Sequence, residues 1–134
     1  MLKSARVLSL FNGTLERSRK YEGVTMLYGD ELFEKMKEMT GATTKRIYRI
    51  IAGTGLIVKY NAGIVQEEIN ASKRGVKVYV ITDVNVQNVS IAMEYSRSVY
   101  LKHLYGANFM LRYVTYDSMN AVIISSNPYL LQKE

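Results

Sequence analysis

The sequence predicts an α/β fold in which a mixed β-sheet is flanked by helices. Short apolar runs alternate with segments whose apolar residues recur at helical spacing, in the order strand, helix, strand, helix, strand, helix, strand, strand. Only four residues, Asp117–Asn120, separate the last two apolar runs, which is short enough for a hairpin of antiparallel strands. Because the earlier strands alternate with helices and the last two form a hairpin, the sheet is expected to be mixed.

The first strand and helix of this alternation are expected between Gly23 and Gly41. Two glycines, Gly23 and Gly29, enclose the apolar run Val-Thr-Met-Leu-Tyr, which suits a strand. Asp30 follows in the position of a helix N-cap, and apolar residues then recur at helical spacing. Gly41 is the expected end of that helix.

The middle of the chain is expected to hold two strands and one helix. Arg46–Ala52 is rich in Ile and Tyr, as in a buried strand, and it ends at Gly53–Gly55, which predicts a turn. A helix is expected from about Asn61 onward, because the apolar residues that follow share one helical face. Val76–Ile81 then predicts a central strand.

The C-terminal third is expected to hold a third helix and the final hairpin. Ile91–Tyr105 has apolar residues at helical spacing, and His103, the only histidine, falls near the end of this helix. The runs Phe109–Tyr116 and Ala121–Ile124 are the expected hairpin strands.

Residues 1–22 permit two interpretations. Val7–Phe11 followed by an Asn-Gly pair fits the first strand of a hairpin, and it fits equally the end of a helix that links to something upstream. This segment is therefore treated as an N-terminal extension or linker, and a single domain is expected over residues 23–134.

Composition excludes several classes of protein. The 134 residues contain no cysteine, which excludes disulfides and thiolate metal sites and favours a cytoplasmic location. No apolar run approaches the length of about 20 residues that spans a bilayer. The net charge is +6, but the basic residues are scattered in small groups among acidic ones, so a solvated surface is favoured over a nucleic-acid footprint.

Three stretches, taken in order, resemble the phospholipase D-like effector domain of TrmB-type archaeal transcription regulators. The first is Glu22–Gly29, which leads into an acidic amphipathic helix. The second is Arg46–Ala52, with the helix and strand that end in Ser72–Val80, and the third is the terminal strand pair ending in Ser125–Asn127. The resemblance implies that residues 23–134 form a phospholipase D-like domain.

Active members of that superfamily carry the motif H-x-K-x4-D. The His attacks phosphorus, the Lys neutralises phosphoryl oxygens and the Asp helps to orient the site. In the frame that ends at Asp117, Met110 stands at the nucleophile position and Arg112 at the lysine position. A thioether neither attacks phosphate usefully nor carries a proton at neutral pH, so the sequence predicts no catalytic residue and no enzyme activity.

The expected ligand site lies beyond the carboxyl ends of the strands, where open α/β sheets bind ligands. The residues assigned to it are Thr54, Gly55, Asp83, Arg112, Asp117, Ser125 and Asn127. Arg112 favours an anionic or polyhydroxylated ligand, because a guanidinium offers several fixed donors. The structural alternatives are a plain strand-to-helix connection at Gly53–Gly55, a hairpin-turn role for Asp117, and an Arg112–Asp117 ion pair that fills the crevice.

The function favoured by these observations is a non-catalytic, ligand-sensing domain of a transcription regulator, binding a sugar or a phosphorylated metabolite. One motif per chain predicts a symmetric homodimer. DNA contact is expected only indirectly, through a helix-turn-helix domain or a partner, since residues 1–22 are too few for such a domain. No cofactor, metal or membrane is indicated. The alternatives are a phosphodiesterase or nuclease of the same superfamily, and a basic nucleic-acid-binding protein.

Overall fold

The computed structural model describes residues 6–11, 24–105 and 111–125, which form seven strands and four helices. The strands are β1 Arg6–Phe11, β2 Val24–Leu27, β3 Arg46–Ile51, β4 Lys77–Thr82, β5 Tyr100–His103, β6 Leu111–Tyr116 and β7 Asn120–Ser125. The helices are α1 Gly29–Ala42, α2 Gly53–Asn61, α3 Ile64–Lys73 and α4 Val89–Ser96.

The seven strands form one mixed sheet in the order β2-β1-β7-β6-β3-β4-β5. Strands β3, β4 and β5 are parallel, because each follows the previous one through a helical crossover, and the other neighbouring strands are antiparallel. The predicted mixed sheet and the β6–β7 hairpin are therefore confirmed. Strand β4 lies between β3 and β5, which agrees with the central position expected for it.

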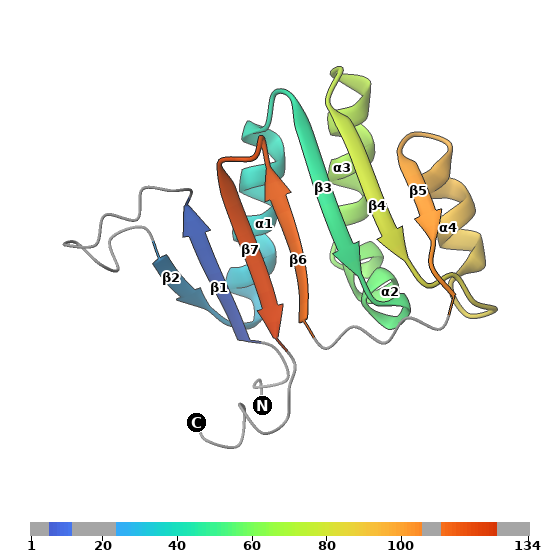
Figure 1. The fold of residues 1–134 in the computed structure, drawn as a ribbon, viewed down its shortest axis with the longest axis horizontal. Helices are drawn as coiled ribbons and strands as arrows, with labels where there is room; N and C mark the ends of the chain where they lie inside the picture. Colours follow the sequence, from blue (N-terminus) through green and yellow to red (C-terminus); the bar gives the residue numbers. More distant parts are fainter. Residues whose placement is uncertain (1–5, 12–23, 106–110, 126–134) are drawn as a thin grey trace.

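The four helices lie on one face of the sheet, as Figure 1 shows. Strand β3 explains this arrangement, because Ile47, Arg49 and Ile51 are buried on the helix side while the alternate residues are more exposed. Methionine and leucine side chains of α1 and valine side chains of β4 complete the core on that side. The opposite face carries Tyr48, Tyr79 and Tyr100, and no described helix covers it.

Two sequence predictions are wrong in the middle and C-terminal parts of the chain. The segment Gly53–Gly55, expected as a turn, is the first turn of helix α2, which a second helix, α3, follows almost at once. The expected long helix Ile91–Tyr105 ends at Ser96, and its second half is the parallel edge strand β5. Val99 lies after the helix but keeps the helical spacing of Ala92 and Tyr95, so helical periodicity alone did not reveal the break.

Smaller differences concern the N-terminal part. Asp30 lies inside the first turn of α1, where its charge suits the helix dipole, and the N-cap residue is Tyr28. The segment Arg6–Phe11 is a strand that pairs with both β2 and β7 within the main sheet. The structure therefore favours the strand interpretation of this segment, while the expected Asn12-Gly13 turn lies outside the described residues.

Candidate functional site

The two ends of the sheet separate the residues that the sequence assigned to one site. Thr54 and Asp83 follow β3 and β4 at the carboxyl end of the parallel strands. Arg112 and Ser125 lie at the same end, because β6 runs antiparallel to β3 and Ser125 pairs with Leu111. Asn127 and Met110 lie outside the described residues.

Asp117 lies at the opposite end of the sheet, so the expected convergence of Asp117 with Arg112 is not observed. Its carboxylate accepts hydrogen bonds from the backbone N–H groups of Thr44, Lys45 and Arg46, at 3.0, 2.7 and 2.9 Å. Burial alone would raise the pKa of Asp117, but these hydrogen bonds lower it below its ordinary value. Asp117 therefore anchors the start of β3 to the hairpin that joins β6 to β7.

The first turn of α2 forms one part of the site at the carboxyl end. The N–H groups of Gly53, Thr54 and Gly55 precede the first intrahelical donor, Leu56, which bonds to Ala52 at 3.1 Å. These three donors have no acceptor among the described residues. Since the N-terminus of a helix also carries partial positive charge, this turn is suited to hold an anion.

Glycine is needed at both ends of the Gly-Thr-Gly turn for steric reasons. A Cβ atom on Gly53 would lie 2.6 Å from the Asp83 carbonyl oxygen, and Asn88 donates to that oxygen and to the Gly53 oxygen at 3.1 Å each. A Cβ atom on Gly55 would lie 3.1 Å from Ile51 and 3.8 Å from Nη1 of Arg112. The two glycines thus hold the Asp83 loop and the Arg112 guanidinium close to the start of α2.

Lys59 is a buried cation on the same face of α2 as Gly55, one turn further along the helix. Its side chain is 6% exposed, and its Nζ lies 5.8 Å from the centre of the Phe33 ring. Among the described residues, no carboxylate lies within ion-pair distance of it. Burial, with the nearby charges of Arg49 and Arg112, lowers the pKa of Lys59 to about 7.

Arg49 and Glu68 form a buried ion pair whose charges act on Lys59. Both Nε and Nη2 of Arg49 donate to Oε2 of Glu68, the first at 2.8 Å, and the hydroxyl of Tyr95 donates to Oε1. These three side chains are at most 3% exposed. Although burial disfavours its charge, the Glu68 carboxylate keeps the pKa of Arg49 above its ordinary value. Burial, with the same carboxylate, raises the pKa of Tyr95 well above its usual range.

Lys59 is the buried cation of this cluster that has no carboxylate within ion-pair distance among the described residues. Arg49 is paired with Glu68, and partial burial lowers the pKa of Arg112. A buried charge like that of Lys59 is unfavourable by itself, and an anion placed at the start of α2 would offset it.

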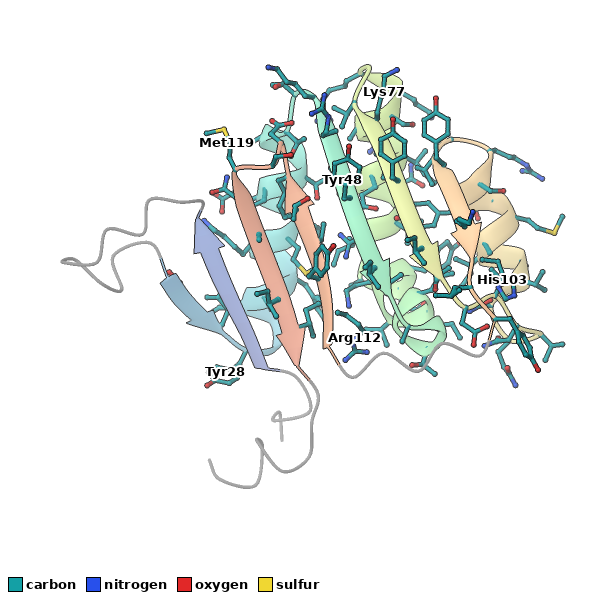
Figure 2. The ribbon with its side chains drawn as sticks, viewed as in Figure 1. Tyr28, Tyr48, Lys77, His103, Arg112 and Met119 are labelled. Atoms are coloured by element: carbon teal, nitrogen blue, oxygen red, sulfur yellow. The ribbon has the colours of Figure 1, made fainter. Side chains whose placement is uncertain are left out.

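Asp83 and His103 complete the carboxyl end on the β4–β5 side. Nδ1 of His103 accepts a hydrogen bond from the Val84 N–H at 2.9 Å, so in the neutral ring the proton is on Nε2. The Asp83 carboxylate lies 3.9 Å from the same Nδ1 atom. Figure 2 shows His103 and Arg112 at this end, separated by β3 and β4. His103 therefore lies on a strand and not at a helix end as expected.

Sequence reasoning missed Lys59, Arg49 and Glu68, although the pattern carried a signal for each. Arg49 shares the strand parity of Ile47 and Ile51, which are buried. Glu68 lies on the apolar face of α3, and Lys59 interrupts an apolar helical segment. A charged residue on an apolar face is rarely left without a partner, so these positions predict a buried network. Within the described residues, no group of three His, Cys, Asp or Glu side chains is arranged to hold a metal ion.

Comparison with known proteins identifies similar folds but no sequence relative. No protein-family model matches the chain, and no curated protein matches it. The archaeal chromatin protein TrmBL2, whose structure shows a novel mode of DNA binding, matches with a TM-score of 0.51 and 15% identity, over 96% of this chain and 48% of TrmBL2. Polyphosphate kinase from Porphyromonas gingivalis matches with a TM-score of 0.50 and 11% identity, over 76% and 22%.

A phospholipase D family member, Nuc from Salmonella typhimurium, also matches, with a TM-score of 0.47 and 18% identity, over 96% of this chain and 88% of Nuc. At these identities the likeness to TrmBL2 and to the polyphosphate kinase concerns the fold alone. The predicted mixed α/β architecture is the one observed. The chain spans about half the length of TrmBL2. None of the described helices is long and apolar enough to cross a membrane.

Proposed function

We propose that this chain is a non-catalytic sensing domain that binds a small anionic ligand, such as a phosphorylated sugar or metabolite, at the carboxyl ends of β3 and β4. The observation that carries the proposal is the first turn of α2, whose N–H groups have no acceptor among the described residues, together with the buried cation Lys59 on the same helix and the Arg112 guanidinium near Gly55. A phosphoryl group is matched to such a site, because it accepts several hydrogen bonds and carries the missing negative charge.

Each part of the site has a distinct role in this proposal. The anionic group is bound by the N–H groups of Thr54 and Gly55 and by the Arg112 guanidinium. Lys59 adds positive charge from its buried position on the same helix. Asp83 accepts hydrogen bonds from hydroxyl groups on the rest of the ligand. Ser125 is retained as a candidate because it lies on β7 at the same end of the sheet. Asn127 is retained as a candidate because it follows Ser125 by two residues.

The non-catalytic assignment rests on the sequence. Met110 occupies the position that a nucleophilic histidine holds in the H-x-K-x4-D frame. His103 is not a substitute, because β3 and β4 separate its strand from β6, a backbone distance of roughly 14 Å at the usual strand spacing. Its Nδ1 atom also accepts from the Val84 N–H, so Asp83 does not orient it as a general base.

A regulatory role follows from what the bound ligand would change. An anion held between α2 and β6 would tie the helix to the strand, and such a change can be passed to an attached domain or partner. The fold shared with TrmBL2, a DNA-binding chromatin protein of about twice this length, supports a place in a DNA-binding regulator. DNA contact is then made by another domain or partner, and the ligand modulates it.

A thermal-shift screen tests this proposal. Sugars, nucleotides and phosphorylated metabolites are screened, because any ligand that binds the native state raises the melting temperature. The best anionic ligand is then titrated against Arg112→Met and against Arg97→Met, the matched control at the other end of the sheet. We expect at least about a 10-fold loss of affinity for Arg112→Met, as for loss of a charged hydrogen bond, and no loss for Arg97→Met.

Two results contradict the proposal. One is an equal loss of affinity in both variants, or no loss in either, which would place binding elsewhere. The other is turnover of a chromogenic phosphodiester that co-purifies with the protein and is abolished in Arg112→Met, which would make the chain an enzyme.

A further inference from the structure

Basic residues that are scattered in the sequence meet at the amino ends of the parallel strands. Lys45 precedes β3 and Arg46 begins it, Lys77 begins β4, Lys73 ends α3 and Arg97 follows α4. Arg46 and Lys77 are register partners, and the Lys77 N–H donates to the Lys45 oxygen at 3.0 Å. All five side chains are exposed. Figure 2 shows Lys77 at the end of the sheet opposite Arg112 and His103.

None of these five cations forms an ion pair with an acidic side chain of the described residues. Asp117 is nearby, but its two carboxylate oxygens are occupied by backbone N–H groups. Attraction to helix C-termini accounts for Lys73 and Arg97. It does not account for Lys45, Arg46 and Lys77, which lie at the starts of strands. Exposed like charges repel only weakly in water, so these cations stay available to a polyanion.

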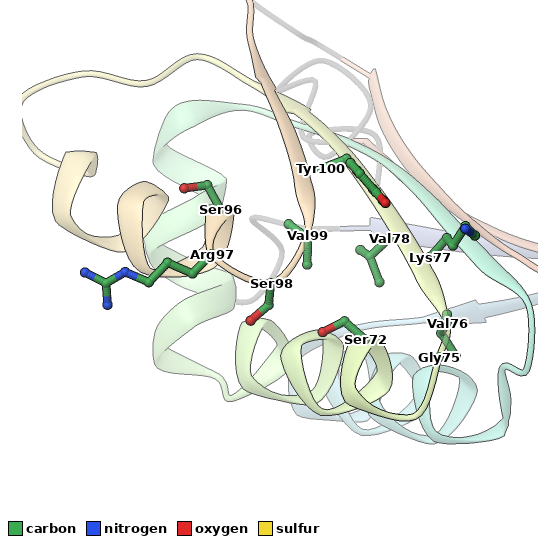
Figure 3. A pocket seen from close by; sticks show the side chains of 10 residues that line it. All are labelled: Ser72, Gly75, Val76, Lys77, Val78, Ser96, Arg97, Ser98, Val99 and Tyr100. Atoms are coloured by element: carbon green, nitrogen blue, oxygen red, sulfur yellow. The ribbon is translucent and has the colours of Figure 1, made fainter.

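A hollow of about 410 Å³ lies within this basic region, between the ends of α3 and α4. Its polar lining is made by Ser72, Lys77, Ser96, Arg97, Ser98 and Tyr100. Figure 3 shows Ser72 and Ser98 facing the hollow below Tyr100. Hydroxyl groups next to Lys and Arg side chains are the donors that phosphate oxygens meet in nucleic-acid complexes.

An exposed aromatic row begins at the same hollow. Tyr48, Tyr79 and Tyr100 are register partners across β3, β4 and β5, and their rings stack at centroid distances of 5.1 and 5.0 Å. Tyr100 is the last of the row, on an edge strand, and is 60% exposed. Its outer ring face has no stacking partner among the described residues. A planar group can therefore stack there and extend the row.

We propose that this amino end binds a single-stranded nucleic acid, with its phosphates on the five cations and an unpaired base stacked on Tyr100. A basic track with an aromatic platform is the combination that single-strand binding requires. A duplex also presents phosphates, but its bases are stacked on one another and leave no free face for Tyr100. This surface lies at the opposite end of the sheet from the proposed ligand site, so each proposal can fail without the other.

Fluorescence anisotropy of a labelled thymidine oligonucleotide of about 20 nucleotides, beside a duplex of the same length, tests this proposal. Arg46→Glu/Lys77→Glu removes the central pair of cations. Lys35→Glu/Lys37→Glu changes the net charge equally on α1, where each lysine pairs with a glutamate of its own helix. Tyr100→Ala removes the platform. Circular dichroism and melting temperature check that each variant is folded.

We expect salt-sensitive binding of the single strand. Arg46→Glu/Lys77→Glu should raise the Kd at least about 10-fold and flatten the salt dependence, whereas Lys35→Glu/Lys37→Glu should raise it less than about 3-fold. Tyr100→Ala should raise the Kd for the single strand at least about 5-fold and leave the duplex nearly unchanged. Equal effects of the two double variants would show attraction by net charge only and overturn the proposal. Absence of binding at about 50 mM salt, or duplex binding as tight as single-strand binding, would also overturn it.

Discussion

The two ends of the sheet carry positive charge in opposite ways. At the carboxyl end, Arg49 and Lys59 are buried on the helix side, and Glu68 holds only one of them in an ion pair. At the amino end, Arg46, Lys77 and their neighbours are exposed, and no carboxylate among the described residues forms an ion pair with them. Buried cations are costly, so they are kept where a defined geometry matters, whereas exposed cations cost little and act collectively. The difference favours a small ligand at one end and an extended polyanion at the other.

The largest expected effect comes from Glu68→Gln at the buried end. This change leaves Arg49 without its counter-charge inside the core, so the free energy of unfolding should fall by about 3 to 5 kcal/mol. Glu67→Gln, one residue earlier on α3 and more exposed, is the control and should change it by less than about 0.5 kcal/mol. Urea denaturation measures both. Similar losses in the two variants would mean that the buried pair is not the centre of the network.

Lys59→Met should stabilise the protein, and the gain should depend on pH. The pKa of Lys59 is lowered to about 7 in the folded chain by burial and by the charges of Arg49 and Arg112. The unfolded chain keeps that proton to about pH 10.5, so the cost of the buried charge is full below pH 7 and disappears as the pH rises toward 10.5. We expect a gain of about 1 to 3 kcal/mol near pH 6 that shrinks by about pH 9.5.

Lys73→Met, an exposed cation at the amino end, is the matched control for that experiment. Its effect on the free energy of unfolding should be within about 0.5 kcal/mol at both pH values. A gain for Lys59→Met that is the same at both pH values would indicate better packing of methionine and not relief of a buried charge.

The smallest expected effect concerns the β6–β7 hairpin at the amino end. Asp117 and Ser118 both have left-handed backbone conformations, with φ of 56° and 58°. Asp117 is left unchanged because its side chain makes hydrogen bonds, whereas Ser118 is exposed. Glycine adopts a left-handed conformation without steric cost, so Ser118→Gly should raise the melting temperature by the equivalent of about 0.5 to 1 kcal/mol. Ser98→Gly, where φ is not positive, should lower it slightly. The opposite order would show that the turn does not limit stability.

The strand and hairpin pattern could be predicted because short apolar runs bounded by glycine or polar residues report buried strands directly. The β5 strand could not, since Val99 continues the helical spacing of α4, and only pairing with β4 fixes the residues that follow as a strand. The start of helix α2 could not be predicted either, because its two glycines are typical of a turn. Those glycines are required for contact with the Asp83 loop and Ile51, which the sequence does not display.

The candidate site was predicted in part. The rule for strand ends placed Thr54, Gly55 and Asp83 at one end of the sheet, and they lie there. Arg112 was included because it stands at the lysine position of the H-x-K-x4-D frame, and it lies at the same end. Asp117 was placed with them because it follows a strand, but that strand runs antiparallel to β3 and brings Asp117 to the other end. The basic amino end was not foreseen, because Lys45–Arg46 and Lys77 are far apart in the sequence and meet only through β-pairing.

Sulfate binding, followed as a rise in melting temperature at constant ionic strength near pH 6 and near pH 8.5, tests whether the carboxyl end of the sheet holds an anion. Sulfate keeps its charge over this range, whereas Lys59 loses its proton near pH 7. We expect a stabilisation that is at least about twice as large near pH 6 as near pH 8.5. Arg112→Met and Lys59→Met should reduce it to the level of a non-specific salt effect, and Arg46→Met/Lys77→Met should leave it intact. Equal stabilisation at both pH values, or its loss in Arg46→Met/Lys77→Met and not in Arg112→Met, would contradict an anion site at the carboxyl end of the sheet.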